Sequence, residues 1–166
     1  MDKKTPAHET LWELIKDIRI GMVTHHGANG QMHAHPLTTQ NKVMDDRGEL
    51  YYFISNQSEL HDRLQADNEV SVAYADPSAD RYVAISGQAS FNDDLAKKEA
   101  LWSPMAKAWF PEGAIDPNLA LLVVNVKHAE YWNVDESKMV QLLKMTKAAI
   151  TGTPPKNLGE HKELDL

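Results

Sequence analysis

Residues 50–64 are LYYFISNQSELHDRL, and they predict a strand that turns through a polar bend directly into a helix. The aromatic and β-branched residues that precede Ser55 favour a strand. Residues 55–58 are typical of a turn, and Ser58 is placed to cap the helix that follows. Backbone amides at a helix start favour an anion, so we expect a phosphate there, with His61 in reach. An ordinary cap followed by a solvent-facing histidine is the alternative.

Several further strands surround this stretch, most of them joined by tight turns. Strands are predicted at residues 20–24, 31–39, 41–44, 49–55, 70–75, 82–91 and 119–132, with Gly87 marking a bulge. Helices are predicted at residues 9–18, 58–66, 95–103, 105–110 and 137–150. This order is typical of an α+β protein whose mainly antiparallel barrel carries peripheral helices. We expect one domain over residues 1–150 and a loosely held C-terminal tail over residues 151–166.

Composition excludes several classes of function. The 166 residues contain no cysteine, which excludes disulfides, thiolate metal sites and a cysteine nucleophile. A net charge of −7 without any basic run argues against nucleic-acid binding. No apolar run is long enough to span a membrane and the start has no signal-like segment, so we expect a cytoplasmic protein without a membrane partner.

Four histidines lie close together in the sequence, at His25, His26, His33 and His35. Imidazoles bind zinc, copper or nickel, and His33 and His35 would share one face of a strand. However, no acidic residue accompanies them, and His25 and His26 are predicted to lie in a solvated turn. We therefore expect no metal site. The pair Asp93 and Asp94 is expected to cap a helix.

Several segments together resemble the general stress protein 26 group of the pyridoxamine 5′-phosphate oxidase-like, flavin-binding split-barrel superfamily. The resemblance covers residues 9–166. Its marks are LWELIKDIR (11–19), HPLTTQ (35–40), YADP (74–77), RYVAISG (81–87), KAWFPEG (107–113) and EYW (130–132). Each segment alone is weak, and their number and order make the match specific.

The resemblance implies a homodimer of split barrels that binds FMN at the subunit interface, with FAD, riboflavin or a deazaflavin as alternatives. It implies that one strand passes along the flavin, and the residues of this strand are His35, Pro36, Leu37, Thr38, Thr39 and Gln40. It also implies that a second segment lines the same site, and its residues are Phe53, Ile54 and Ser55. The helix start from Ser58 to His61 would bind the phosphate. Tyr82 and Trp132 would approach the ring from the other subunit.

Two positions depart from the family pattern. His35 stands where relatives often have arginine, and His61 where they have lysine or arginine, so permanent cations are replaced by groups that titrate near neutrality. Arg63 or Lys42 could compensate. The expected function is a flavin-dependent oxidoreductase of unknown substrate that uses NAD(P)H or another donor. A non-catalytic flavin carrier and a haem- or metal-binding protein are the alternatives.

Overall fold

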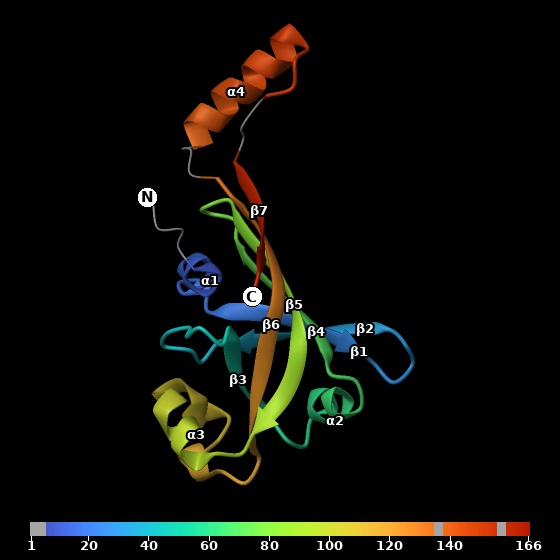
Figure 1. Ribbon diagram of the computed structural model, residues 1–166, viewed down its shortest axis with the longest axis vertical. Helices are drawn as coiled ribbons and strands as arrows, with labels where there is room; N and C mark the ends of the chain where they lie inside the picture. The colour runs from blue at the N-terminus through green and yellow to red at the C-terminus, as the bar shows by residue number, and fades with distance from the viewer. Residues whose placement is uncertain (1–5, 135–137, 156–158) are drawn as a thin grey trace.

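The structure is a computed structural model that describes residues 6–134, 138–155 and 159–166 (Figure 1). Its elements, in chain order, are α1 (Ala7–Ile15), β1 (Ile20–His26), β2 (Met32–Thr38), β3 (Glu49–Ser55), α2 (Glu59–Ala66), β4 (Glu69–Asp76), β5 (Arg81–Asn92), α3 (Leu95–Leu101), the 3-10 helices η1 (Pro104–Ala108) and η2 (Gly113–Ile115), β6 (Leu119–Asn133), α4 (Lys138–Thr151) and β7 (Glu160–Asp165).

The seven strands form one antiparallel sheet that curls into a split barrel. Six strands follow the order β2-β1-β4-β5-β6-β3. β7 lies off this path and pairs with β6. The two ends of this path meet at a single bridge between Thr39 and Tyr52, where the Gln40 amide donates to the Tyr51 carbonyl at 2.8 Å. Alternate side chains such as Val70, Val72 and Tyr74 fill the interior. The predicted α+β split barrel with peripheral helices is confirmed.

A bulge bends β5 where it pairs with β6. The register shifts between Ser86 and Gly87, as the isolated glycine predicts. A Cβ atom built at Gly87 would lie 2.5 Å from the Asn125 carbonyl oxygen, so only glycine allows this close approach of two backbones. The bulge lets β5 and β6 run the whole height of the barrel.

The prediction of a strand at residues 41–44 is wrong. The chain leaves the sheet there, and the Asn41 side chain takes the place of a neighbouring strand. Its amide nitrogen donates to the Glu49 carbonyl at 2.8 Å, and its oxygen accepts from the Tyr51 amide at 2.8 Å. One buried asparagine thus satisfies the β3 edge, which hydropathy patterns cannot foresee.

The prediction of a loosely held tail over residues 151–166 is wrong for β7, which pairs with β6 from Asn133↔Glu160 to His128↔Asp165. Residues 156–158 of that tail lie outside the described residues, as does Ser137 at the predicted start of α4. β7 has the sequence EHKELD, in which Leu164 is the one apolar side chain and packs against the core. A single apolar residue gives no periodic pattern, which conceals the strand from sequence analysis.

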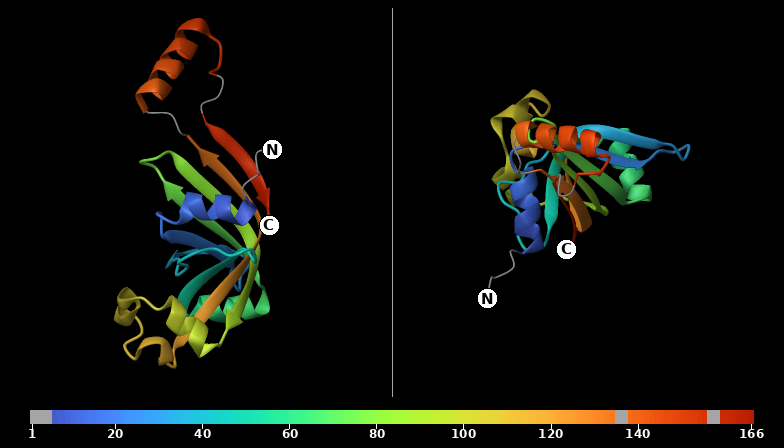
Figure 2. Two further views of the ribbon diagram at one scale, coloured as in Figure 1. Left: turned by 60° about the vertical axis from the view of Figure 1, so that its left-hand side comes forward. Right: turned by 90° about the horizontal axis from the view of Figure 1, so that it is seen from above.

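Apart from α1, the helices lie towards the two ends of the long axis (Figure 2). Figure 2 shows α1 crossing the sheet, α2 and α3 with the 3-10 helices at one end of the long axis, and α4 at the other. Asp94 caps α3 by accepting from the Ala96 amide at 3.0 Å, as predicted. In the described part of the chain, none of the helices combines the length and apolar character needed to cross a bilayer.

Candidate functional site

An open segment lies between β2 and β3, which we call the split. The two strands meet at the Thr39↔Tyr52 bridge. In the described residues, no ladder pairs the part of β2 before Thr38 with β3, or the part of β3 after Phe53 with β2. Thr39 donates to Arg19 on the β1 side, so by antiparallel alternation the backbone groups of Pro36 and Thr38 are directed towards β3. The Pro36 carbonyl and the Thr38 amide therefore face the split, whereas the Thr38 carbonyl accepts from the Gln40 side-chain amide at 3.1 Å.

The predicted site residues divide between the two faces of the sheet. Pro36 and Thr38 are exposed on the outside, and Phe53 and Ser55 are half-buried there. The remaining members of the two segments point inwards or are buried: His35, Leu37, Thr39, Gln40 and Ile54. A ligand on the outer face of the split would touch side chains of the first group and only the backbone of the second. Successive side chains of a strand point to opposite faces of the sheet, so neighbours in the sequence lie on different faces here.

Three buried hydroxyls fix the closed end of the split. The Tyr74 hydroxyl lies 2.6 Å from the Thr39 hydroxyl and 2.6 Å from the Tyr52 hydroxyl. All three side chains are almost completely buried. Burial raises the pKa of Tyr52 well above its ordinary value and also raises the pKa of Tyr74, so both phenols stay neutral and can share hydrogen bonds. This group links β4 to the bridge.

The start of α2 closes the other end of the split, just after Ser55. Ser58 caps the helix: its hydroxyl accepts from the His61 amide at 3.2 Å and donates to the Ser55 carbonyl at 2.6 Å. The predicted cap is confirmed. The amides of Glu59 and Leu60 belong to the first helical turn and have no acceptor inside the helix. Two donors and the positive end of the helix dipole thus meet the end of β3.

The His61 side chain does not face outwards from the helix start. Its ring packs on Phe91 of β5, with centroids 4.6 Å apart. Its Nδ1 is buried and makes no hydrogen bond within the described chain, although the Asp62 carboxylate lies 3.5 Å away. The Arg63 side chain donates to the His26 carbonyl and the Lys42 amine to the Ala100 carbonyl, so both cations are engaged elsewhere. The backbone amides are therefore the principal anion donors here.

The histidine cluster is more ordered than the sequence predicts. His25 and His26 end β1 rather than lying in a solvated turn, and His25 is 1% exposed. Its Nε2 lies 3.0 Å from Nε2 of His35, on the inner face of the hairpin. Burial lowers the pKa of His35, and the neighbouring His25 lowers it further. His35 is thus favoured in its neutral form, and one imidazole of the pair can donate to the other.

Acidic groups do accompany these histidines, contrary to expectation. Nδ1 of His33 lies 3.5 Å from a Glu59 oxygen, and Nδ1 of His26 lies 3.1 Å from an Asp67 oxygen. His26, Asp67 and Glu69 have potential ligand atoms within 4.8 Å of one another. These acids lie far from the histidines in sequence, in α2, at its C-terminal cap and in β4, which explains why sequence spacing missed them. The hydrogen bond between His26 and Asp67 accounts for their contact without a metal.

Tyr82 and Trp132 lie far from the split within one chain. They face each other across β5 and β6, are 41% and 39% exposed, and Trp132 stacks on His161 with centroids 4.9 Å apart. Phe91, which contacts His61, is nine residues further along β5, so about 30 Å of strand separates the two places. One chain alone does not bring all the predicted residues together.

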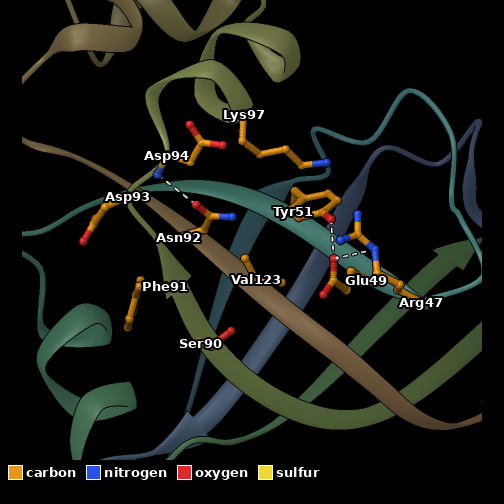
Figure 3. A pocket seen from close by; sticks show the side chains of 10 residues that line it. All are labelled: Arg47, Glu49, Tyr51, Ser90, Phe91, Asn92, Asp93, Asp94, Lys97 and Val123. Carbon is orange, nitrogen blue, oxygen red and sulfur yellow. Dashed lines mark hydrogen bonds and ion pairs between the residues drawn. The ribbon is translucent and has the colours of Figure 1, made fainter.

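Figure 3 shows a separate groove of about 410 Å³ on the outer face of β3, β5 and β6, beside α3. Its charged lining residues interact with one another: Tyr51 donates to Glu49, Arg47 lies 3.7 Å from Glu49, and the Lys97 amine lies 4.3 Å from the centre of the Tyr51 ring. Burial and the Glu49 carboxylate raise the pKa of Tyr51. Sequence reasoning did not identify this groove, because its residues come from four separate segments.

Comparison with known proteins agrees with this architecture. The model of the family "pyridoxamine 5′-phosphate oxidase like" matches residues 6–156. A candidate general stress protein 26 from Jannaschia sp. CCS1 has 24% identity and a TM-score of 0.73, covering 93% of this chain and 95% of its own. A general stress FMN/FAD binding protein from Xanthomonas citri has 32% identity and a TM-score of 0.68, covering 79% and 91%.

A haem binding protein from Mycobacterium smegmatis shares the fold at 19% identity, with a TM-score of 0.59 and coverage of 78% of this chain and 55% of its own. No curated protein matches. The matched span includes strands β1 to β6, the split and the start of α2. The chain therefore belongs to the pyridoxamine 5′-phosphate oxidase-like family.

Proposed function

We propose that this protein binds FMN along the split between two copies of the chain and acts as a flavin-dependent oxidoreductase. One observation carries the proposal: the split is closed by the Thr39↔Tyr52 bridge at one end and by the start of α2 at the other. A flat polar ring could form hydrogen bonds with the backbone groups that face the split. A phosphate at the end of the same ligand could accept from the amides at the start of α2. The 32% identical relative from Xanthomonas citri is named for FMN/FAD binding, which supports a flavin.

The residues present fit an FMN molecule. Outward groups of Pro36, Thr38, Phe53 and Ser55 would contact the ring and its chain, and the amides at Glu59 and Leu60 would bind the phosphate. A bound flavin supplies electron or hydride transfer. The chain's own part is to orient the ring by backbone hydrogen bonds and to exclude water with Phe53. The absence of cysteine fits a reducing cytoplasm.

A second copy would complete the site. Tyr82 and Trp132 lie at one end of the β5–β6 ladder, whereas Phe53 and Ser55 pair with the other end of β6, at Leu121 and Leu119. A two-fold axis across the middle of the ladder exchanges these ends, so each copy would offer its two aromatic rings to the split of the other. Exposure of both rings in the single chain supports this arrangement.

Visible absorption of the purified protein, followed by titration with FMN and riboflavin, tests the proposal. We expect FMN to bind in the micromolar range or tighter. Ser58→Asp is the informative variant, because aspartate also caps a helix but adds a negative charge where the phosphate should lie. It should weaken FMN by at least about tenfold, equivalent to 1.4 kcal/mol, and leave riboflavin unchanged. A colourless protein that takes up neither flavin would refute the proposal.

Turnover distinguishes an oxidoreductase from a flavin carrier. Anaerobic mixing of the FMN-loaded protein with NADH or NADPH should bleach the flavin faster than free FMN at the same concentration. Bleaching at the rate of free FMN with every donor would leave binding intact and assign the carrier function instead.

Haem is the second candidate, because the fold is shared with a haem binding protein and two imidazoles converge at His25 and His35. Their Nε2 atoms are engaged with each other, so haem binding would have to break that contact. Titration with haemin while following the Soret band tests this candidate, and an unchanged spectrum dismisses it.

A further inference from the structure

The amphipathic helix α4 turns its apolar side away from its own chain. Gln141, Lys144 and Ala148 are half-buried, and Gln141 donates to the Asp80 carboxylate of the β4–β5 turn at 3.4 Å. The large apolar side chains are exposed: Val140, Leu142, Leu143, Met145 and Ile150. A globular helix normally buries its apolar face. This face of α4 therefore requires a cover that the described residues of its own chain do not supply.

The charge of α4 favours a protein cover of acidic character. Its segment KMVQLLKMTKAAIT contains three lysines and no acidic residue, and because the whole chain carries −7 the rest of it carries −10. A second copy of this chain is thus electrostatically attractive to α4.

An exposed apolar patch of matching type lies at the opposite end of the molecule. Met105 and Trp109, on η1 and its end, are 85% and 81% exposed, and Ile115 on η2 is 67% exposed. Figure 1 shows the region around α3, which includes this segment, and α4 at the two ends of the long axis. Exposed aromatic and aliphatic side chains within one short segment are typical of interaction surfaces. We call these three residues the Trp109 patch.

The two surfaces are related by the same symmetry that completes the flavin site. The segment carrying α4 follows the end of β6 that pairs with Arg81, and the Trp109 patch lies between the far ends of β5 and β6. A two-fold axis across the ladder places each α4 beside the Trp109 patch of the other copy, twice per dimer. We propose that α4 is an exchanged arm that covers the Trp109 patch of a second copy, an inference that rests on the proposed dimer.

Covalent linkage tests the contact directly, since the natural chain has no cysteine. The variant with Leu143→Cys and Met105→Cys should form a disulfide-linked dimer under mild oxidation. A link within one chain is excluded, because the twelve residues of β5 place the two ends roughly 36 Å apart and a disulfide needs Cα atoms within about 7 Å. The control pairs Leu143→Cys with Asn29→Cys, at the tip of the exposed β1–β2 hairpin, and should stay unlinked.

A second measurement separates the arm from the flavin site. The double variant Leu142→Ser, Leu143→Ser should raise the dimer dissociation constant by at least about tenfold in analytical ultracentrifugation, because buried leucine contacts are lost. FMN-loaded dimers that neither cross-link nor weaken would overturn the exchanged arm and leave the proposed function standing. Cross-linked dimers that bind no flavin would overturn the proposed function alone. Binding of the natural chain, without cross-linking of the cysteine pair, to vesicles of anionic lipid would overturn the arm in favour of a membrane surface.

Discussion

Replacing Tyr74 by phenylalanine tests the buried hydroxyls that close the split. The change removes one oxygen and both of its 2.6 Å hydrogen bonds, to Thr39 and Tyr52, without altering the shape of the ring. Both partners are buried, so water cannot replace the lost bonds. Each unsatisfied buried group costs about 1–3 kcal/mol. Because the two remaining hydroxyls could bond each other after a small shift, the low end applies, and the free energy of unfolding should fall by about 2–4 kcal/mol.

Urea unfolding followed by tryptophan fluorescence measures this loss. With a slope of about 2 kcal/mol per molar urea, the midpoint should fall by about 1–2 M. Tyr82→Phe is the matched control, because the exposed Tyr82 hydroxyl makes no buried contact and its loss should change stability by less than about 0.5 kcal/mol.

A double-mutant cycle identifies the cause of the loss. Tyr52→Phe combined with Tyr74→Phe should be less destabilising than the sum of the single changes, with a coupling of about 0.5–3 kcal/mol. A fall of less than about 0.5 kcal/mol for Tyr74→Phe, or strict additivity with Tyr52→Phe, would refute the view that these hydroxyls depend on each other.

Three further changes test other parts of the barrel. Gly87→Ala should lower the melting temperature by several degrees or more, because its Cβ would lie 2.5 Å from the Asn125 carbonyl; calorimetry measures this, and an unchanged melting temperature would contradict the tight bulge. Ser58→Ala should cost about 1 kcal/mol of stability through the lost cap, and urea unfolding that matches the natural chain would show that the cap is dispensable. The pKa of His35 is lowered in the folded state, so the unfolded state binds a proton more readily below pH 6.5 and the free energy of unfolding should fall as the pH drops below that value. In His35→Gln the free energy of unfolding should depend less steeply on pH. Equal slopes in both proteins would exclude a contribution from His35.

The barrel strands could be predicted because their side chains carry a regular two-residue period or a continuous apolar run. β3 has the predicted bounds of residues 49–55, and β6 extends the buried run from Leu119 to Asn133. The bulge at Gly87 and the cap at Ser58 were also predictable, because each depends on the conformational preference of one residue type. Local signals therefore determined most of the sheet.

The misses share a different cause. Asn41 satisfies β3 through its side chain, and His33 meets Glu59 from another element. β7 pairs through its backbone and offers the core a single apolar side chain, Leu164. None of these features leaves a periodic apolar pattern. The faces of the candidate site were likewise hidden, because contiguous residues from His35 to Gln40 alternate between the interior and the outside of the barrel. Only the observed sheet register could assign each side chain to a face.

Pro36 explains why the ladder between β2 and β3 stops after the Thr39↔Tyr52 bridge. Its backbone is directed towards β3, and proline has no amide hydrogen to donate, so the ladder that begins at the Thr39↔Tyr52 bridge cannot continue through this position. On the opposite strand the Ser55 carbonyl is already occupied by Ser58, through both its amide and its hydroxyl. β2 and β3 therefore lack matching partners at the same point in the ladder. These features prevent the barrel from closing there and leave the Pro36 carbonyl and the Ser55 amide facing the split. They link the local chemistry of one proline and one cap to the site proposed for FMN.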